Sequence, residues 1–320
     1  MLSRIAESLY WMARNLERAD DSARILDINV LYMLEADEGT TEETQWKPLL
    51  NILDADDAYR QRYEDGAISV QRVIQFLTQD KSNPSCIHSS LRLARENARV
   101  VRDRISGEMW EAINEFWLQV DKHLMAKLQP WRAAEFYAYV HREVALFFGL
   151  TQASMMRGEA YGFTVVGSLQ ERADMTARIL DVRYHLLLPD VSLVGSPLDY
   201  YQWGALLKSL SGFDAYRRRY HEGIRPIDVV EFVVLNPDFP RSLAYCVDSM
   251  GRALERIGLA AATAVAGSLQ ALRLHLADTT PQAILDQGLH EYLDQFLILM
   301  ARLTQALQAD YFEAHLGDAQ

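Results

Sequence analysis

The sequence has few cysteines and no long apolar run. Its two cysteines, Cys86 and Cys246, form no CxxC motif, and this usage favours a reducing cytoplasm in which each packs as a small buried hydrophobe. No window approaches 18 uncharged apolar residues, so no transmembrane helix is predicted. Residues 1–20 lack the apolar core and the cleavage site of a signal peptide, so we expect a cytoplasmic protein.

Positive charge is also scarce. Lysine and arginine number 32 against 44 aspartates and glutamates, which gives a formal net charge of -12. A general nucleic-acid binder needs a basic face, and an acidic surface is repelled by anionic membranes. The charge balance therefore predicts neither a nucleic-acid partner nor a membrane partner.

Catalytic signatures are missing as well. The sequence contains no GxxxxGK[ST], GxGxxG, GxSxG or HExxH motif, so it has no recognisable nucleotide loop, serine nucleophile or zinc peptidase helix. None of its eight histidines follows a glutamate by three residues, so the Glu-x-x-His pairs of di-iron helical bundles are missing. These motifs predict neither a reaction nor a cofactor.

Only nine prolines interrupt a strong helical pattern. They fall where the hydrophobic period breaks, and we predict that they mark helix starts and loops. Apolar residues step by four and three from Ile5 to Met33, as in a helix. No segment alternates like a strand, so the predicted fold class is all-α, with about three quarters of the residues helical. Residues 35–45 are predicted to form an acidic loop.

The sequence contains an internal repeat. NLERADDSARILDI at 15–28 returns 154 residues later as LQERADMTARILDV at 169–182. Further matches pair residues 46–53 with 203–210, 57–66 with 214–223, and 83–91 with 239–247. A repeat at this period indicates a duplicated supersecondary unit. We therefore predict two pseudo-repeats, 1–154 and 155–320, packed face to face as a single helical bundle-like domain covering residues 1–320.

Each copy of the first repeated segment carries three acids and one arginine on one side of a helix, at spacings of 3, 4 and 3. The first strip consists of Glu17, Asp20, Arg24 and Asp27, and the second of Glu171, Asp174, Arg178 and Asp181. The first helix is apolar on nearly all sides, which predicts that it is buried. Buried acids need a cation as partner.

Three interpretations of these strips remain open. Arg18 and Arg172, or an arginine from another helix, could form crossed Glu/Arg pairs that lock the two halves together. Alternatively, the strips form a polar site at the interface between the halves. In the third interpretation they bind a hard metal such as Mg²⁺, which takes carboxylate ligands.

A basic stripe follows in SLRLARENARVVRDR, residues 90–104. It consists of Arg92, Arg95, Arg99 and Arg102, with Glu96 and Asn97 in the same turns. A solvated helix face is the first interpretation. Pairing with the acidic strips is the second, and binding of an anionic group such as phosphate or a peptide carboxylate is the third.

Together these motifs resemble the bacterial Alpha-E family, named for an α-helical domain with a recurrent Glu-Arg motif. The matching segments are LYWMARNLERAD, SLQERADMTARILD and residues 83–114. The resemblance places the Glu-Arg motif at Glu17–Arg18 and Glu171–Arg172, and an ARENAR element at Arg95 to Arg99. It places an NPxS element at residues 83–86, where this chain has Cys86 instead of serine.

Members of the family are typically encoded beside a circularly permuted ATP-grasp protein, often with a transglutaminase-like peptidase nearby. The resemblance implies a role in a peptide-forming or peptide-modifying system, and we expect a helical partner of the ATP-grasp protein that presents a polar cleft between its halves. The expected binding residues are Glu17, Arg18, Asp20, Arg24, Glu171, Arg172, Asp174 and Arg178, with Arg95, Asn97, Arg99 and Arg102.

Two other functions remain open. One is an enzyme of the same pathway, in which Glu17 or Glu171 acts as general base and arginines hold an anionic, peptide-like substrate. The other is a structural or oligomerisation module without a ligand. The oligomeric state is not predicted.

Overall fold

The computed structural model describes residue 1 and residues 3–33, 41–64, 66–124, 128–187, 197–258 and 263–313. These residues contain fifteen α-helices and no strand, and 80% of the chain is helical. The all-α prediction is therefore confirmed. The acidic loop predicted at residues 35–45 lies partly outside the described residues, and a helix begins within it at Glu42. No described helix is long and apolar enough to cross a membrane.

The chain forms one set of helices before residue 155 and a second set after it. The first set is α1 (Ser3–Met33), α2 (Glu42–Ile52), α3 (Asp56–Arg62), α4 (Val70–Thr78), α5 (Ile87–Val100), α6 (Gly107–His123) and α7 (Pro130–Ser154). The second is α8 (Glu159–Leu187), α9 (Pro197–Ser209), α10 (Phe213–Arg219), α11 (Pro226–Val230), α12 (Leu243–Ile257), α13 (Ala264–Ala277), α14 (Pro281–Gln287) and α15 (Leu289–Leu307). Two short π-helical turns, η2 (Glu231–Leu235) and η3 (Gln308–Phe312), follow α11 and α15.

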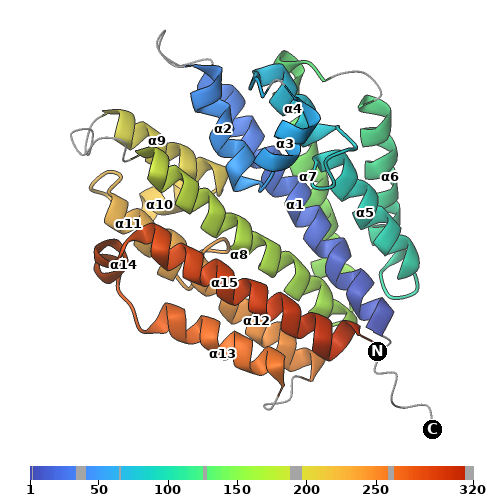
Figure 1. Ribbon diagram of the computed structural model, residues 1–320. Coiled ribbons are helices and arrows are strands. Elements are labelled where there is room, and N and C mark those ends of the chain that lie inside the picture. Colours follow the sequence, from blue (N-terminus) through green and yellow to red (C-terminus); the bar gives the residue numbers. More distant parts are fainter. Residues whose placement is uncertain are drawn as a thin grey trace.

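The long helices α1 and α8 lie side by side through the middle of the molecule (Figure 1). Helices α5 and α7 pack on α1, and helices α12 and α15 pack on α8. The short helices α2 and α9 also contact both central helices. This is the arrangement expected if the two sets are repeats, and the division at residue 154 stays a prediction.

The two central helices form the inside of the bundle. In α1, residues on every side of the helix are buried, among them Leu9, Tyr10 and Ile25, as its all-round apolar character predicts. Helix α8 approaches α1 closely at Gly167, where an added Cβ would lie 2.3 Å from the carbonyl oxygen of Tyr10. Glycine therefore sets how near the two backbones can come at this crossing.

Most prolines lie where the sequence predicts them. Pro130 and Pro281 are the first residues of α7 and α14, a position that needs no backbone N–H. The prediction is wrong for Pro48, which lies inside α2. A proline there costs a backbone hydrogen bond, but the neighbouring Trp46 and Leu49 are fully buried. Packing of these side chains outweighs the local preference.

Candidate functional site

The two Glu-Arg segments meet where α1 and α8 face each other. Arg18 donates from Nε and Nη2 to the two carboxylate oxygens of Glu171, at 2.6 and 3.1 Å. Arg172 donates in the same way to Glu17, at 2.7 and 3.0 Å. Each pair is bidentate and joins α1 to α8, and each glutamate is only 1% exposed. Of the three interpretations of the strips, this geometry is that of crossed Glu/Arg pairs.

A second arginine completes the coordination of each glutamate, and its source differs between the two. Arg14, one turn before Arg18 on α1, contacts Glu171 Oε2 at 2.7 Å. Arg241, in the loop before α12, lies 3.2 Å from Glu17 Oε1. Both arginines are buried. We call these side chains together, with Asp20 and Asp21, the Glu/Arg cluster.

The arginine within each strip pairs along its own helix. Arg24 Nε donates to Asp20 Oδ2 at 2.8 Å, and Arg178 Nε donates to Asp174 Oδ2 at 2.8 Å. These are the favourable i,i+4 pairs of a helix surface. His141 on α7 also contacts Asp20, with 2.9 Å between Nδ1 and Oδ1.

The arginines fix the ionisation of the carboxylates that they contact. Burial by itself would raise the pKa of Glu171, but the charges of Arg14 and Arg18 outweigh it and lower that pKa to about 2. Burial also works against ionisation of Asp20. Its hydrogen bond with His141 and the charges of Arg24 and Arg241 lower its pKa to about 2. Both groups are therefore anions at neutral pH, and with pKa values so far below 7 they are too weakly basic to be efficient general bases.

Asp21 differs from the other acids of the cluster. Its Oδ1 accepts a hydrogen bond from Arg241 at 2.6 Å, while its Oδ2 is buried without a partner in the described structure. Burial raises the pKa of Asp21 to about 8, despite the charge of Arg241. Burial of a carboxyl group with one unpaired oxygen disfavours its charged form, so the protonated form is favoured.

The metal interpretation meets an obstacle in Arg241. Oxygens of Glu17, Asp20 and Asp21 lie within 4.8 Å of one another, a spacing that could hold a metal ion. The guanidinium of Arg241 already contacts all three carboxylates, at 2.6 to 3.2 Å. A cationic side chain of the protein thus already contacts the three groups that could hold such an ion.

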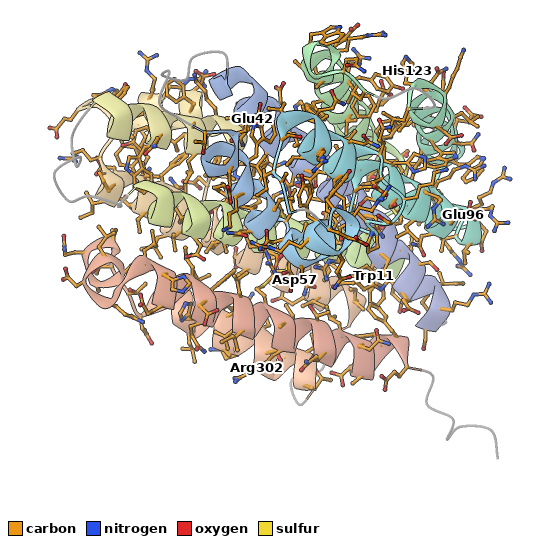
Figure 2. The ribbon with its side chains drawn as sticks, turned by 45° about the horizontal axis from the view of Figure 1, so that its top comes forward. Trp11, Glu42, Asp57, Glu96, His123 and Arg302 are labelled. Carbon is orange, nitrogen blue, oxygen red and sulfur yellow. The ribbon has the colours of Figure 1, made fainter. Side chains whose placement is uncertain are left out.

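The basic stripe, which lies on α5 and in the turn after it, is not brought to the Glu/Arg cluster. Arg95 donates to Asn114 on α6 at 2.8 Å, and Arg99 pairs with Glu96. Arg102 stacks over the ring of Trp110, 4.7 Å from its centroid. Figure 2 shows Glu96 at the outer edge of the molecule on α5. Pairing with the acidic strips is therefore not found among the described residues.

Asn97, the remaining predicted member of this group, uses its side chain locally. Its Nδ2 donates to the backbone carbonyl of Leu93 at 2.9 Å. Arg99, in the last turn of α5, and Arg102, in the turn that follows the helix, are exposed. These residues stay candidates for contact with a partner, at a surface separate from the cluster.

A small pocket opens beside the Arg18–Glu171 pair. It has a volume of about 160 Å³, and its polar lining consists of Arg18, Asp54, Ser85, Glu171, Asp174 and Arg178. A larger cavity of about 440 Å³ lies elsewhere, between the turns that follow α5 and α7, and includes Ile105 and Met155. The smaller pocket is lined by four of the predicted site residues, Arg18, Glu171, Asp174 and Arg178.

The element at residues 83–86 begins α5. Cys86 is the N-cap of this helix, and its Sγ accepts a hydrogen bond from the backbone N–H of Ser89 at 3.3 Å. Serine at this position would cap the helix in the same way, so the sulfur fills the structural role that a hydroxyl would have. Burial raises the pKa of the Cys86 thiol, which keeps it unreactive.

Sequence reasoning did not assign Arg14, Asp21 and Arg241 to the cluster. Arg241 lies in a loop, 69 positions beyond Arg172, and no spacing rule connects it to α1. A signal exists in the predicted repeat, which pairs Arg14 with Ser168 and Arg241 with Ser85. Departures from the repeat mark the residues that complete the cluster.

The fold and the cluster define a class of all-α protein in which two central helices are joined by crossed Glu-Arg pairs. Residues 1–312 match the model of the family Alpha-E, described as a predicted alpha-helical domain with a conserved ER motif. The match covers nearly the whole chain, so the protein belongs to the Alpha-E family. No curated protein and no solved structure matches it.

Proposed function

We propose that this protein is a non-catalytic helical partner of an ATP-grasp-type system that forms or modifies peptides. The observation that carries the proposal is the state of the two motif glutamates. Glu17 and Glu171 are each buried and bound by two arginines. Side chains used in this way stabilise a rigid scaffold and leave its outer surface for recognition.

The same geometry argues against an enzyme that uses these glutamates as bases. A general base needs an accessible oxygen and a pKa near the working pH. The pKa of Glu171 is lowered to about 2, and its oxygens accept hydrogen bonds from Arg14 and Arg18. Removing a proton from a substrate would require breaking these ion pairs.

The exposed part of the basic stripe is the surface that we assign to the partner. In a chain with a net charge of -12, Arg99 at the end of α5 and Arg102 in the turn after it present positive charge, and Arg102 lies over Trp110. Arginine and tryptophan are enriched in the energetically important centres of protein interfaces. An acidic patch of the partner protein would complement this surface.

Co-expression with a circularly permuted ATP-grasp protein of the same organism, followed by size-exclusion chromatography at micromolar concentration, tests the proposal. We expect a single co-eluting complex. Arg99→Glu with Arg102→Glu should weaken it, whereas Arg132→Glu with Arg142→Glu on the exposed face of α7 should leave it intact. Elution of the wild-type proteins as two separate peaks would contradict the proposed function.

A further inference from the structure

The pocket beside the Arg18–Glu171 pair has a counterpart in the same molecule that is filled. The predicted repeat pairs Ser85, in the pocket wall, with Arg241. It also pairs Glu171 with Glu17, which Arg241 contacts at 3.2 Å. On one side of the bundle, the side chain of Arg241 therefore occupies the space that corresponds to the open pocket above Ser85 on the other side.

The turn that closes the pocket supports this correspondence. The repeat pairs Asp54, after α2, with Ser211, after α9. These are the two non-glycine residues with positive φ among the described residues, at 51° and 52°. The two turns thus share a backbone conformation, and they place the hydroxyl of Ser211 beside the first strip and the carboxylate of Asp54 beside the second.

The arginines of the two strips differ in how many of their donors are used. Arg24 binds Asp20 through Nε, Ser211 through Nη1 and His141 through Nη2. Arg178 binds Asp174 through Nε, and its Nη1 and Nη2 have no partner among the described residues. Two parallel N–H donors of a guanidinium are well suited to a carboxylate.

Unused acceptors lie in the same pocket. Asp174 Oδ1 and both carboxylate oxygens of Asp54 accept no hydrogen bond from the described residues. Burial would lower the pKa of Arg178, but the charge and hydrogen bond of Asp174, with a smaller contribution from the charge of Asp54, raise it. The pocket therefore offers a guanidinium donor pair and two carboxylates at once.

Charge balance decides which ligand can bind the guanidinium donors and the carboxylates of the pocket at the same time. Where Arg241 is bound, Asp21 adds a third acid. The repeat places Met175 at that position of the pocket, and Arg14 already supplies a second arginine to Glu171. Around the pocket, Arg14, Arg18 and Arg178 balance Asp54, Glu171 and Asp174. A ligand with a single charge would disturb this balance, whereas one with both signs and no net charge would not.

We propose that this pocket binds a free α-amino acid as its zwitterion. The carboxylate lies against Arg178 and the remaining donor of Arg18, and the ammonium lies against Asp54 and Asp174. Because the pocket measures about 160 Å³, it admits a small side chain. The isolated chain is sufficient for this binding, so the inference is tested separately from complex formation with the ATP-grasp protein.

Thermal unfolding of the full chain with each of the common amino acids at millimolar concentration, followed by isothermal titration calorimetry, tests the inference. A ligand that binds only the folded state raises Tm. At least one small amino acid should raise Tm, and its methyl ester and its N-acetyl derivative should each bind about tenfold more weakly or worse. Equal binding of either derivative, or of guanidinium alone, would overturn the assignment of a zwitterion.

Two variants locate the binding. Ser85→Arg supplies the side chain that Arg241 supplies to the other strip, and it should reduce affinity by about 100-fold or more. Ser82→Arg adds the same charge at an exposed position of the preceding loop and should leave affinity unchanged. If Ser85→Arg does not fold, Asp54→Asn, at an exposed position, should weaken binding by about tenfold. Unchanged affinity in the folded pocket variant, or no Tm response to any amino acid, would refute the inference.

Discussion

Arg18 on α1 binds Glu171 on α8 through two hydrogen bonds, and the residue that follows Glu171 returns the same contact to α1. Each helix thus gives one anion and one cation to the other. A reciprocal arrangement of this kind fixes the register of the two helices, because sliding one of them would break both pairs. The cluster therefore holds the two helices in register and also contains many buried charged groups.

Glu17→Ala should reduce the free energy of unfolding by about 3 kcal/mol, because it leaves Arg172 and Arg241 buried without their anion. Urea denaturation at neutral pH measures the change. Glu115→Ala, at an exposed position of α6, is the matched control and should change stability by less than about 0.5 kcal/mol. A similarly small effect of Glu17→Ala would show that the Glu17 pairs do not stabilise the fold.

Arg241→Ala should be destabilised by about 3–5 kcal/mol, since Glu17 and Asp20 lose a buried cation and Asp21 loses a hydrogen-bond donor. The vacated space suits a guanidinium ion. We expect millimolar guanidinium chloride to raise the Tm of Arg241→Ala while leaving the wild-type Tm unchanged or slightly lower. Sodium chloride at the same ionic strength controls for screening, and equal responses to the two salts would contradict this explanation.

Stability should fall in acid because of Glu171 and Asp20. Their folded-state pKa values of about 2 lie below the ordinary values of 4.5 and 3.8. A lowered pKa contributes stability above the unfolded value, and this contribution is lost as pH falls from about 4.5 towards 2. Glu171→Gln should remove part of this slope in urea titrations across that range. A slope identical to that of the wild type would exclude Glu171 as a source.

The effect of Asp21 on the pH dependence of stability should be opposite to that of Glu171 and Asp20. Its folded-state pKa of about 8 lies above the ordinary value of 3.8, so its contribution to stability is complete below about pH 3.8 and is lost as pH rises to 8. Asp21→Asn should therefore lose less stability than the wild type between pH 5 and pH 9. Asp238→Asn, at an exposed position, is the control and should follow the wild type. Parallel curves for Asp21→Asn would contradict burial of a protonated carboxyl.

Gly167→Ala should separate α8 from α1. The added methyl group would meet the backbone oxygen of Tyr10 at 2.3 Å, which only a backbone shift can relieve, and overpacking of this kind costs about 1–3 kcal/mol. Gly149→Ala, whose Cβ would meet nothing within 4 Å on α7, is the control. It should be neutral or stabilising, because alanine favours the helix. Equal stability of the two variants would mean that the crossing tolerates a wider spacing.

The sequence by itself determined the fold class and the composition of the central strips. The step of three and four residues from Ile5 to Met33 predicts α1, because a helix that is buried on all sides must carry apolar residues on all sides. The pairs Asp20–Arg24 and Asp174–Arg178 were also readable, because i,i+4 contacts depend only on helix geometry. Pro48 is an exception to prediction from local sequence, because burial of its neighbours in α2 outweighs the preference of proline for helix starts and loops.

Only the tertiary structure decided which cation meets which acid. Arg14 and Arg241 complete the same kind of site from different elements, one from the turn before Arg18 and one from a loop more than 200 residues further along the chain. Which arginine reaches each glutamate depends on how α8 and the loop before α12 pack against α1. No local sequence pattern predicts this packing. The pocket above Ser85 has the same origin, because a cavity exists only where packed elements leave a space that no side chain reaches.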